Sequence, residues 1–279
     1  MAYKSLMTVL TNAEAMEATL SAAVELARHE DAHLEVLCLG IDRTQAGYYY
    51  AGAAIVLQQE MLERAEEDAR KLDAKVQEVL GREDIRWSSE AAVAQLGGLN
   101  GLVAVRARFN DMVILPKPFG EHRSQEDEAI IEAAIFEGQT PVLVLPEGGL
   151  GARIGSRVVV AWNESSEALN AVRQALPLLR SADSVNIAVV DPSRHGPERS
   201  DPGGPLSQML ARHGVRTEVS VLAKTLPKVS EVLLRHVHDQ EADLLVMGAY
   251  GHSRFREAIL GGATRAMLEQ TDVPVFMAH

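Results

Sequence analysis

The stretch SRVVVAWNESSEALNAVRQALPLLRSADSVNIAVVDPS, residues 156–193, decides the fold. It begins with a short apolar run, continues through a polar turn into a segment rich in Ala and Leu, and ends with a second apolar run. In the middle segment, Ala168, Leu169, Val172 and Leu176 recur at the spacing of one helix face. The two outer runs are continuous rather than alternating, which is typical of strands covered on both faces. The stretch therefore predicts a strand, a helix and a second, parallel strand.

The same order of elements opens the chain, so the sequence contains a repeat. Three pairs of segments correspond: SLMTVLTNAEAMEATLSAAVELARHEDAHLEVLCLGID (5–42) with 156–193, NDMVILP (110–116) with ADLLVMG (242–248), and TPVLVLP (140–146) with DVPVFMAH (272–279). We interpret this as two copies of one domain, residues 1–147 and residues 154–279. The connection near PEGGLGARIG (146–155) has the Gly and Pro content of a linker.

Helical patterns alternate with apolar runs throughout the second copy. The runs are VVVAW, VNIAVVD, TEVSVLA, DLLVMG and VPVFMA, and the segment PKVSEVLLRHVHDQ between them has a helical pattern. This alternation predicts an α/β protein made of two tandem doubly wound, mostly parallel five-stranded sheet domains with right-handed crossovers. We also expect the strands VLVLP and VPVFMAH to lie side by side, which pairs the domains about a pseudo-twofold axis.

The two copies differ after their second strand. In the first, Leu57, Met61, Ala65, Leu72 and Val76 predict one long amphipathic helix. The second has a Pro/Gly-rich loop and a shorter helix within GPERSDPGGPLSQMLARHGV. Three tyrosines before the long helix either pack at its start or form a partner surface.

The composition excludes several classes of function. The net charge is −12 and the pI is about 5.2, so binding of bulk nucleic acid or of an anionic membrane surface is not expected. The single cysteine, Cys38, excludes a disulfide framework and fits a buried strand residue. We find neither an export signal nor an apolar run of about 18 residues, and we expect a cytoplasmic protein.

Four glycines gather in VMGAYGHSRFREAILGGATRAML, residues 246–268, between an apolar strand and a helix. Parallel α/β sheets bind ligands at the carboxyl ends of their strands. Glycine lets a ligand approach the backbone, and free N–H groups at a helix start attract phosphate. His252, Arg254, Arg256 and Arg265 add positive charge. The alternative is that these glycines are ordinary turn and packing residues.

The spacing Gly-x2-Gly-x9-Gly-Gly in this stretch resembles the signature of the universal stress protein family. The closing segment ADLLVMGAYGHSRFREAILGGATRAMLEQTDVPVFMAH and the segment VVVAWNESSEALNAV both follow that family's pattern. The whole chain resembles the tandem, two-domain type, with an adenine nucleotide alpha hydrolase-like fold. Some members of the family bind ATP and some do not, and their roles concern stress survival.

The resemblance implies a nucleotide site in the second domain, for ATP or AMP with or without Mg²⁺. Two residues depart from the pattern of ATP-binding members: Gly262 replaces a Ser or Thr, for which Thr264 is a candidate substitute, and Asn163 replaces an Asp. The implied binding residues are Ala161, Asn163, Val189, Met247, Gly248, Gly251, His252, Arg254, Gly261, Gly262, Ala263 and Thr264.

The matching loop of the first domain has the opposite character. Pro116 stands where Gly248 stands, Pro118 follows, and acidic residues fill SQEDE (124–128). Proline has no N–H and cannot adopt positive φ. We therefore interpret the first domain as a degenerate, structural copy.

Other motifs carry little chemistry. His236 and His238 are two residues apart on a predicted helix, point in different directions, and fit an exposed pair rather than a metal site. Trp162 could stack on a base or pack in the core. Without a nucleophile and base pair we expect no enzyme, although slow ATP hydrolysis or autophosphorylation stays open. The leading hypothesis is a nucleotide-binding stress protein with an unknown protein partner. The alternative is a ligand-free scaffold, and a homodimer is left open.

Overall fold

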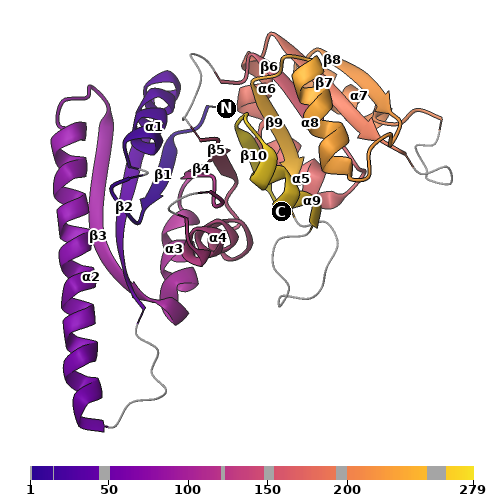
Figure 1. Ribbon diagram of the computed structural model, residues 1–279. Helices are drawn as coiled ribbons and strands as arrows, with labels where there is room; N and C mark the ends of the chain where they lie inside the picture. Colours follow the sequence, from indigo (N-terminus) through magenta and orange to yellow (C-terminus); the bar gives the residue numbers. More distant parts are fainter. Residues whose placement is uncertain are drawn as a thin grey trace. The chain divides into compact units, whose positions relative to one another are not determined.

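The computed structural model describes residues 2–14, 16–43, 51–120, 123–147, 154–192, 200–249 and 262–279, with the side chains of 51–57 outside this description. The chain divides into two compact units (Figure 1). The N-terminal unit comprises Tyr3–Pro116 and His122–Thr140. The C-terminal unit comprises Pro141–His279 together with the short segments Met1–Ala2 and Lys117–Glu121.

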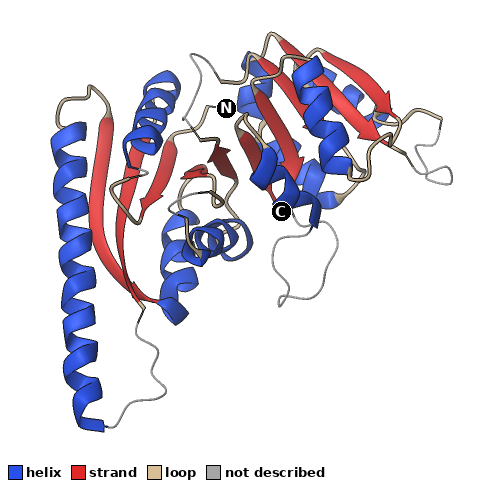
Figure 2. Ribbon diagram, viewed as in Figure 1, coloured by secondary structure: helices blue, strands red, loops and turns tan. Residues whose placement is uncertain are grey.

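The N-terminal unit alternates strands and helices. Its elements are β1 (Ser5–Leu10), α1 (Met16–Glu30), β2 (His33–Asp42), α2 (Ala51–Leu80), β3 (Arg86–Gln95), η1 (Leu96–Gly98), α3 (Leu99–Ala107), β4 (Met112–Pro116), α4 (Gln125–Glu132) and η2 (Ala133–Glu137). Its strands lie in the order β3-β2-β1-β4, and every pair among them is parallel. Figure 2 shows helices flanking these strands.

Helices cover both faces of this sheet. On β2, Gly40 meets the backbone of Ala65 in α2, where an added Cβ would lie 2.7 Å from the Ala65 carbonyl carbon. Glu35 lies on the same strand, an odd number of residues from Gly40. It accepts a hydrogen bond at 3.2 Å from Asn110, which follows α3. Side chains alternate between the faces of a strand, so α2 and the end of α3 lie on opposite faces. The doubly wound arrangement is confirmed.

The long helix α2 buries the predicted stripe. Ala65, Leu72 and Val76 are buried and Met61 is half-buried, while the side chain of Leu57 lies outside the description. Burial at every third or fourth residue holds α2 along β2 and β3 through apolar contact. The counterpart in the second half is the nine-residue helix α7, so the predicted difference is confirmed.

The C-terminal unit repeats the alternation. Its elements are β5 (Val142–Leu145), β6 (Arg157–Ala161), α5 (Ser166–Gln174), α6 (Leu176–Ser181), β7 (Ser184–Val190), α7 (Gly204–Arg212), β8 (Thr217–Leu222), α8 (Val229–Asp239), β9 (Leu244–Gly248), α9 (Gly262–Gln270) and β10 (Val275–Ala278). The strand order is β5-β10-β9-β6-β7-β8. Only β5 runs antiparallel to its neighbour, with Val144 opposite Val275 and Val142 opposite Met277. The predicted pairing of these two strands is confirmed.

The helix predicted in the middle of the stretch 156–193 is divided in two. α5 ends at Gln174, Ala175 has φ −80° and ψ −2°, and α6 begins at Leu176 with Pro177 in its first turn. Proline lacks an N–H and crowds the preceding turn, so a continuous helix would lose a hydrogen bond at this point. Periodicity alone does not reveal this break.

The prediction that His236 is exposed is wrong. Its side chain is 7% exposed, and Nε2 lies 2.9 Å from Asn186 Oδ1. Asn186 in turn donates from Nδ2 to Ser220 Oγ at 2.9 Å. Burial lowers the pKa of His236, and the nearby Asp239 only partly opposes this. The buried histidine is therefore a neutral member of a polar chain from α8 across β7 to β8.

Cys38 is buried, as predicted, and burial followed by the charge of Asp73 raises the pKa of its thiol to about 12. Across the described parts of the chain, no helix is both long enough and apolar enough to span a membrane. The same parts contain no group of three or more His, Cys, Asp or Glu side chains that could hold a metal ion.

Candidate functional site

The carboxyl ends of three neighbouring strands bring several predicted residues together. Ala161, the last residue of β6, lies in register with Ala188 of β7 on one side and with Met247 of β9 on the other. Ala161 is half-buried, whereas Met247 is 8% exposed. Backbone groups and small side chains thus form most of this edge.

Val189 stands at the same edge but its side chain is covered. It is 3% exposed, and an added Cβ on Gly203, which precedes α7, would lie 3.5 Å from its Cγ2. A ligand at this edge would therefore meet the backbone of Val189 rather than its side chain.

Gly248 ends β9 directly against the first turn of α5. An added Cβ would lie 2.5 Å from Ala168 N and 2.7 Å from the carbonyl carbon of Glu167. No real Cβ tolerates such contact with backbone, so helix packing alone requires glycine here. The glycine that the sequence assigns to ligand approach thus has a structural reason as well.

Asn163 follows β6 and is exposed. Its Oδ1 accepts a hydrogen bond from Ser165 N at 3.2 Å, and Ser165 Oγ accepts one from Ala168 N at 3.1 Å as the cap of α5. The Asn163 side chain therefore uses its acceptor to shape the turn, and its Nδ2 group supplies the donors of this exposed amide.

The first turn of α9 is small and open. Gly262 and Ala263 are exposed, an added Cβ at Gly262 would meet nothing within 4 Å, and this turn contains no acidic residue. Thr264 is 4% exposed, so its side chain is buried rather than offered to solvent. The first N–H groups of a helix have no partner within that helix. Gly262 and Ala263 place no large side chain at this turn.

The remaining loop residues lie outside the described part of the chain. These are Gly251, His252, Arg254, Arg256 and Gly261.

Arg265 is described and already engaged. Its Nε donates to Glu269 Oε1 at 2.8 Å, and its guanidinium lies 4.9 Å from the centre of the Phe119 ring. Its charge therefore serves contacts within the C-terminal unit.

Two further residues, Trp162 and His279, follow strands at this edge. Trp162 is 7% exposed, and its Nε1 finds no hydrogen-bond partner among the residues that the structure describes. His279, which the sequence did not single out, places Nδ1 3.0 Å from the carbonyl oxygen of Ala249, and its own carbonyl oxygen accepts from Asn170 Nδ2 at 2.6 Å. His279 thus connects the exit of β9 to α5, a long-range contact that no local pattern signals.

The corresponding place in the N-terminal unit is filled by acids. Ser124 precedes α4, and its N–H donates to Asp127 Oδ2 at 2.8 Å. Glu126, whose side chain is 9% exposed, accepts from Arg43 Nε at 2.6 Å. Burial alone would raise the pKa of Glu126, but contacts with Ser124, Arg43 and its own backbone N–H hold it below the usual value.

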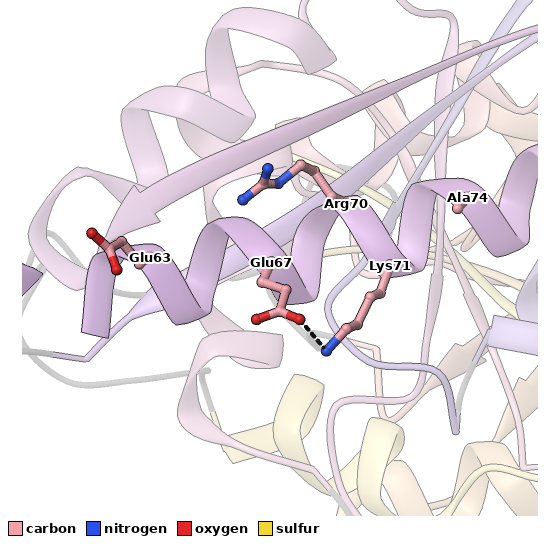
Figure 3. Close-up of a pocket in the computed structure, with 5 residues that line it drawn as sticks. All are labelled: Glu63, Glu67, Arg70, Lys71 and Ala74. Atoms are coloured by element: carbon pink, nitrogen blue, oxygen red, sulfur yellow. Dashed lines mark ion pairs between the residues drawn. The ribbon is translucent and has the colours of Figure 1, made fainter. Parts of the chain in front are cut away.

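One groove among the described residues lies elsewhere, along α2 (Figure 3). Glu63, Glu67, Arg70, Lys71 and Ala74 line it, and all five come from this one helix. Lys71 Nζ lies 2.7 Å from Glu67 Oε1, so opposite charges there satisfy one another. An exposed ion pair of this kind contributes little and does not define a ligand site.

Comparisons with known proteins agree with this architecture. The model of the universal stress protein family matches residues 156–279. The universal stress protein Slr1230 of Synechocystis sp. is 32% identical over 91 residues, which are 33% of this chain and about a third (31%) of that relative's length.

Two solved structures share the fold along nearly the whole chain. A universal stress protein from Archaeoglobus fulgidus has a TM-score of 0.70 at 16% identity, covering 98% of this chain and 96% of that one. A functionally unknown protein from Pseudomonas aeruginosa PAO1 has a TM-score of 0.60 at 14% identity, covering 99% and 92%. The strand order, the glycine-bearing edge and the sequence match together identify the C-terminal part of the chain, residues 156–279, as a domain of the universal stress protein family.

Proposed function

We propose that the C-terminal unit binds an adenine nucleotide, ATP or AMP, and that the chain acts in the cytoplasm as a stress-response protein rather than as an enzyme. The observation that carries this proposal is the open first turn of α9. Gly262 and Ala263 are exposed at this turn, and the turn contains no acidic residue. Free N–H groups at a helix start and the helix dipole favour a phosphate there.

The base and ribose would lie along the carboxyl ends of β6, β7 and β9. Ala161 is small enough to leave room at the centre of this edge, and Met247 beside it offers backbone groups. Asn163 would contribute as a donor through Nδ2, because its Oδ1 already accepts from Ser165 N. This assigns Asn163 to an acceptor on the nucleotide, such as a ring nitrogen or a hydroxyl oxygen.

A specific observation supports the alternative, a scaffold without ligand. Gly248 is required by the approach of α5, so its presence is explained without any nucleotide. Under this alternative the protein presents surfaces to an unknown partner and the edge stays empty. The two functions differ in one measurable property, which is whether adenine nucleotides stabilise the folded chain.

Thermal unfolding of the full chain separates them. Melting temperatures are measured with ATP, ADP and AMP, each with and without Mg²⁺, and with matched sodium chloride as the blank. A ligand that binds only the folded state stabilises it by about 2.7 kcal/mol at a concentration 100 times its Kd. A rise in the melting temperature supports nucleotide binding, and no rise at millimolar concentrations of all three rejects it.

Turnover is a separate question with its own measurement. Phosphate release is followed over hours at saturating ATP and Mg²⁺, beside a chain that carries Ala263→Glu in the first turn of α9. Release at the same rate in both proteins indicates background. Phosphate release that is faster in the parent than in Ala263→Glu would show that the chain hydrolyses ATP, and the proposal of a non-enzyme would fall.

A further inference from the structure

The N-terminal unit holds a buried carboxylate at the start of a helix. Glu126 lies in the first turn of α4, and its side chain is 9% exposed. Arg43, 83 residues earlier in the chain, reaches it with Nε at 2.6 Å. Arg43 directly follows β2, whereas α4 follows β4. The ion pair therefore crosses the carboxyl edge of the sheet, the edge at which α/β sheets hold ligands.

The groups that surround Glu126 are those that bind a phosphate. They are a guanidinium from Arg43, which donates to Glu126, the hydroxyl of Ser124, which donates to Asp127 Oδ2 at 3.2 Å, and a backbone N–H at a helix start. Arginine, hydroxyl and helix N–H donors recur wherever proteins hold oxyanions. Here these donors address carboxylates of the same chain, Glu126 and Asp127.

We propose that Glu126 is an internal anion, which occupies the oxyanion position at the start of α4 with Arg43 as its counter-charge and so keeps the edge of the N-terminal unit closed to phosphate ligands. The neighbouring acids serve the same end. Asp127 caps the helix through Ser124 N, and Glu128 adds a third carboxylate in this turn. An external anion would have to displace the Glu126 carboxylate, and it would then be repelled by the carboxylates of Asp127 and Glu128.

The two units therefore differ in a defined way. The first turn of α9 has no acid, with Gly262 and Ala263 exposed, whereas α4 has three acids in its first turn. The assignment of Glu126 rests on contacts within the N-terminal unit, so it stands whether or not the C-terminal unit binds a nucleotide.

The first test removes the internal anion and offers an external one. Inorganic pyrophosphate is titrated by calorimetry into the full chain, into E126A/E128A, and into R43A/E126A/E128A, at equal ionic strength. We expect one more equivalent of pyrophosphate per chain in E126A/E128A than in the unsubstituted chain, and its loss when Arg43 is also removed. Any site in the C-terminal unit is common to all three proteins and cancels in the difference.

Two outcomes of this titration overturn the proposal. One is equal stoichiometry in the unsubstituted chain and in E126A/E128A. The other is an extra equivalent that persists without Arg43.

A second measurement covers the case in which the double variant does not fold. The carboxyl carbon of Glu126 is titrated by NMR in the unsubstituted chain and in Arg43→Met, which removes the cation and keeps the length of the side chain. We expect a midpoint below that of an ordinary glutamate in the unsubstituted chain and a clear rise in Arg43→Met. An unchanged midpoint would show that Arg43 does not hold Glu126, and the proposal would fall.

Discussion

Gly248 and Ala168 lie so close that the end of β9 and the first turn of α5 meet backbone against backbone. An added Cβ at position 248 would lie 2.5 Å from Ala168 N and 2.9 Å from its Cα. Backbone of a capped helix cannot yield as a flexible side chain can. This contact fixes where β9 ends and where its following loop begins, and it makes the stability of the C-terminal unit sensitive to a single methyl group.

Gly248→Ala should therefore destabilise the folded chain by about 1–3 kcal/mol, the usual range for forced overpacking. Urea unfolding followed by circular dichroism measures the change. Gly262→Ala is the matched control, because an added Cβ there meets nothing within 4 Å. Its free energy of unfolding should stay within about 0.5 kcal/mol of the parent or rise by up to about 1 kcal/mol. Equal effects of both substitutions would show that the close contact does not exist.

His236 should make the C-terminal unit less stable in mild acid. Burial lowers its pKa in the folded state, so between the folded and unfolded pKa values the unfolded chain binds more protons. The stabilising contribution is therefore complete above the ordinary histidine pKa of about 6.5 and is lost as the pH falls below it. The free energy of unfolding, measured from pH 8 to pH 5, should decline in the parent.

Two glutamine variants separate His236 from the other groups that titrate in this range. His236→Gln keeps a donor toward Asn186 Oδ1 and should decline less than the parent. His238→Gln removes a neighbouring ring that is exposed and lies 3.5 Å from Asp272, and it should keep the decline that His236 causes. A curve for His236→Gln that matches the parent would contradict a buried neutral histidine.

The thiol of Cys38 should be inert in the folded chain. Its pKa is raised to about 12 from an ordinary thiol value of 9.0, which lowers the thiolate fraction at pH 8 roughly 10³-fold. Burial also keeps the reagent from the sulfur. Modification by a disulfide reagent should therefore be at least that much slower in buffer than in denaturant. Comparable rates in the two solvents would place Cys38 at the surface.

Much of the fold follows from local patterns. The buried stripe of α2 at Ala65, Leu72 and Val76 follows from a 3.6-residue period, and the strands follow from continuous apolar runs. The pairing of β5 with β10 follows from the repeat. Such features depend on neighbours in the sequence or on correspondence between the two halves.

Other features depend on contacts that no local pattern contains. Arg43 and Glu126 are 83 residues apart in the sequence. Each is a charged residue among other polar residues, so neither position signals the ion pair. His236 on α8 is buried because Asn186, 50 residues away, supplies a hydrogen-bond partner. The close approach of Gly248 to α5 is likewise invisible until the helix is placed. Local sequence patterns indicate the edge of the sheet at which a ligand would bind. The tertiary contacts determine which residues at that edge are free to contact a ligand.

The difference between the two helix starts gives the sharpest test of the candidate site. Ala263→Glu places in α9 the kind of acid that α4 carries, at a position that is exposed and therefore tolerant of a longer side chain. Two like unit charges about 4 Å apart repel by roughly 1 kcal/mol in water and about 4 kcal/mol near a protein surface. Since about 1.4 kcal/mol is a tenfold change, affinity for ATP should fall at least about fivefold. Ala263→Gln, of equal size without the charge, should bind nearly as the parent does, and both variants should unfold at similar urea concentrations. Equal affinity of the Glu and Gln variants, measured by calorimetry with ATP, would mean that the phosphates do not lie at the start of α9.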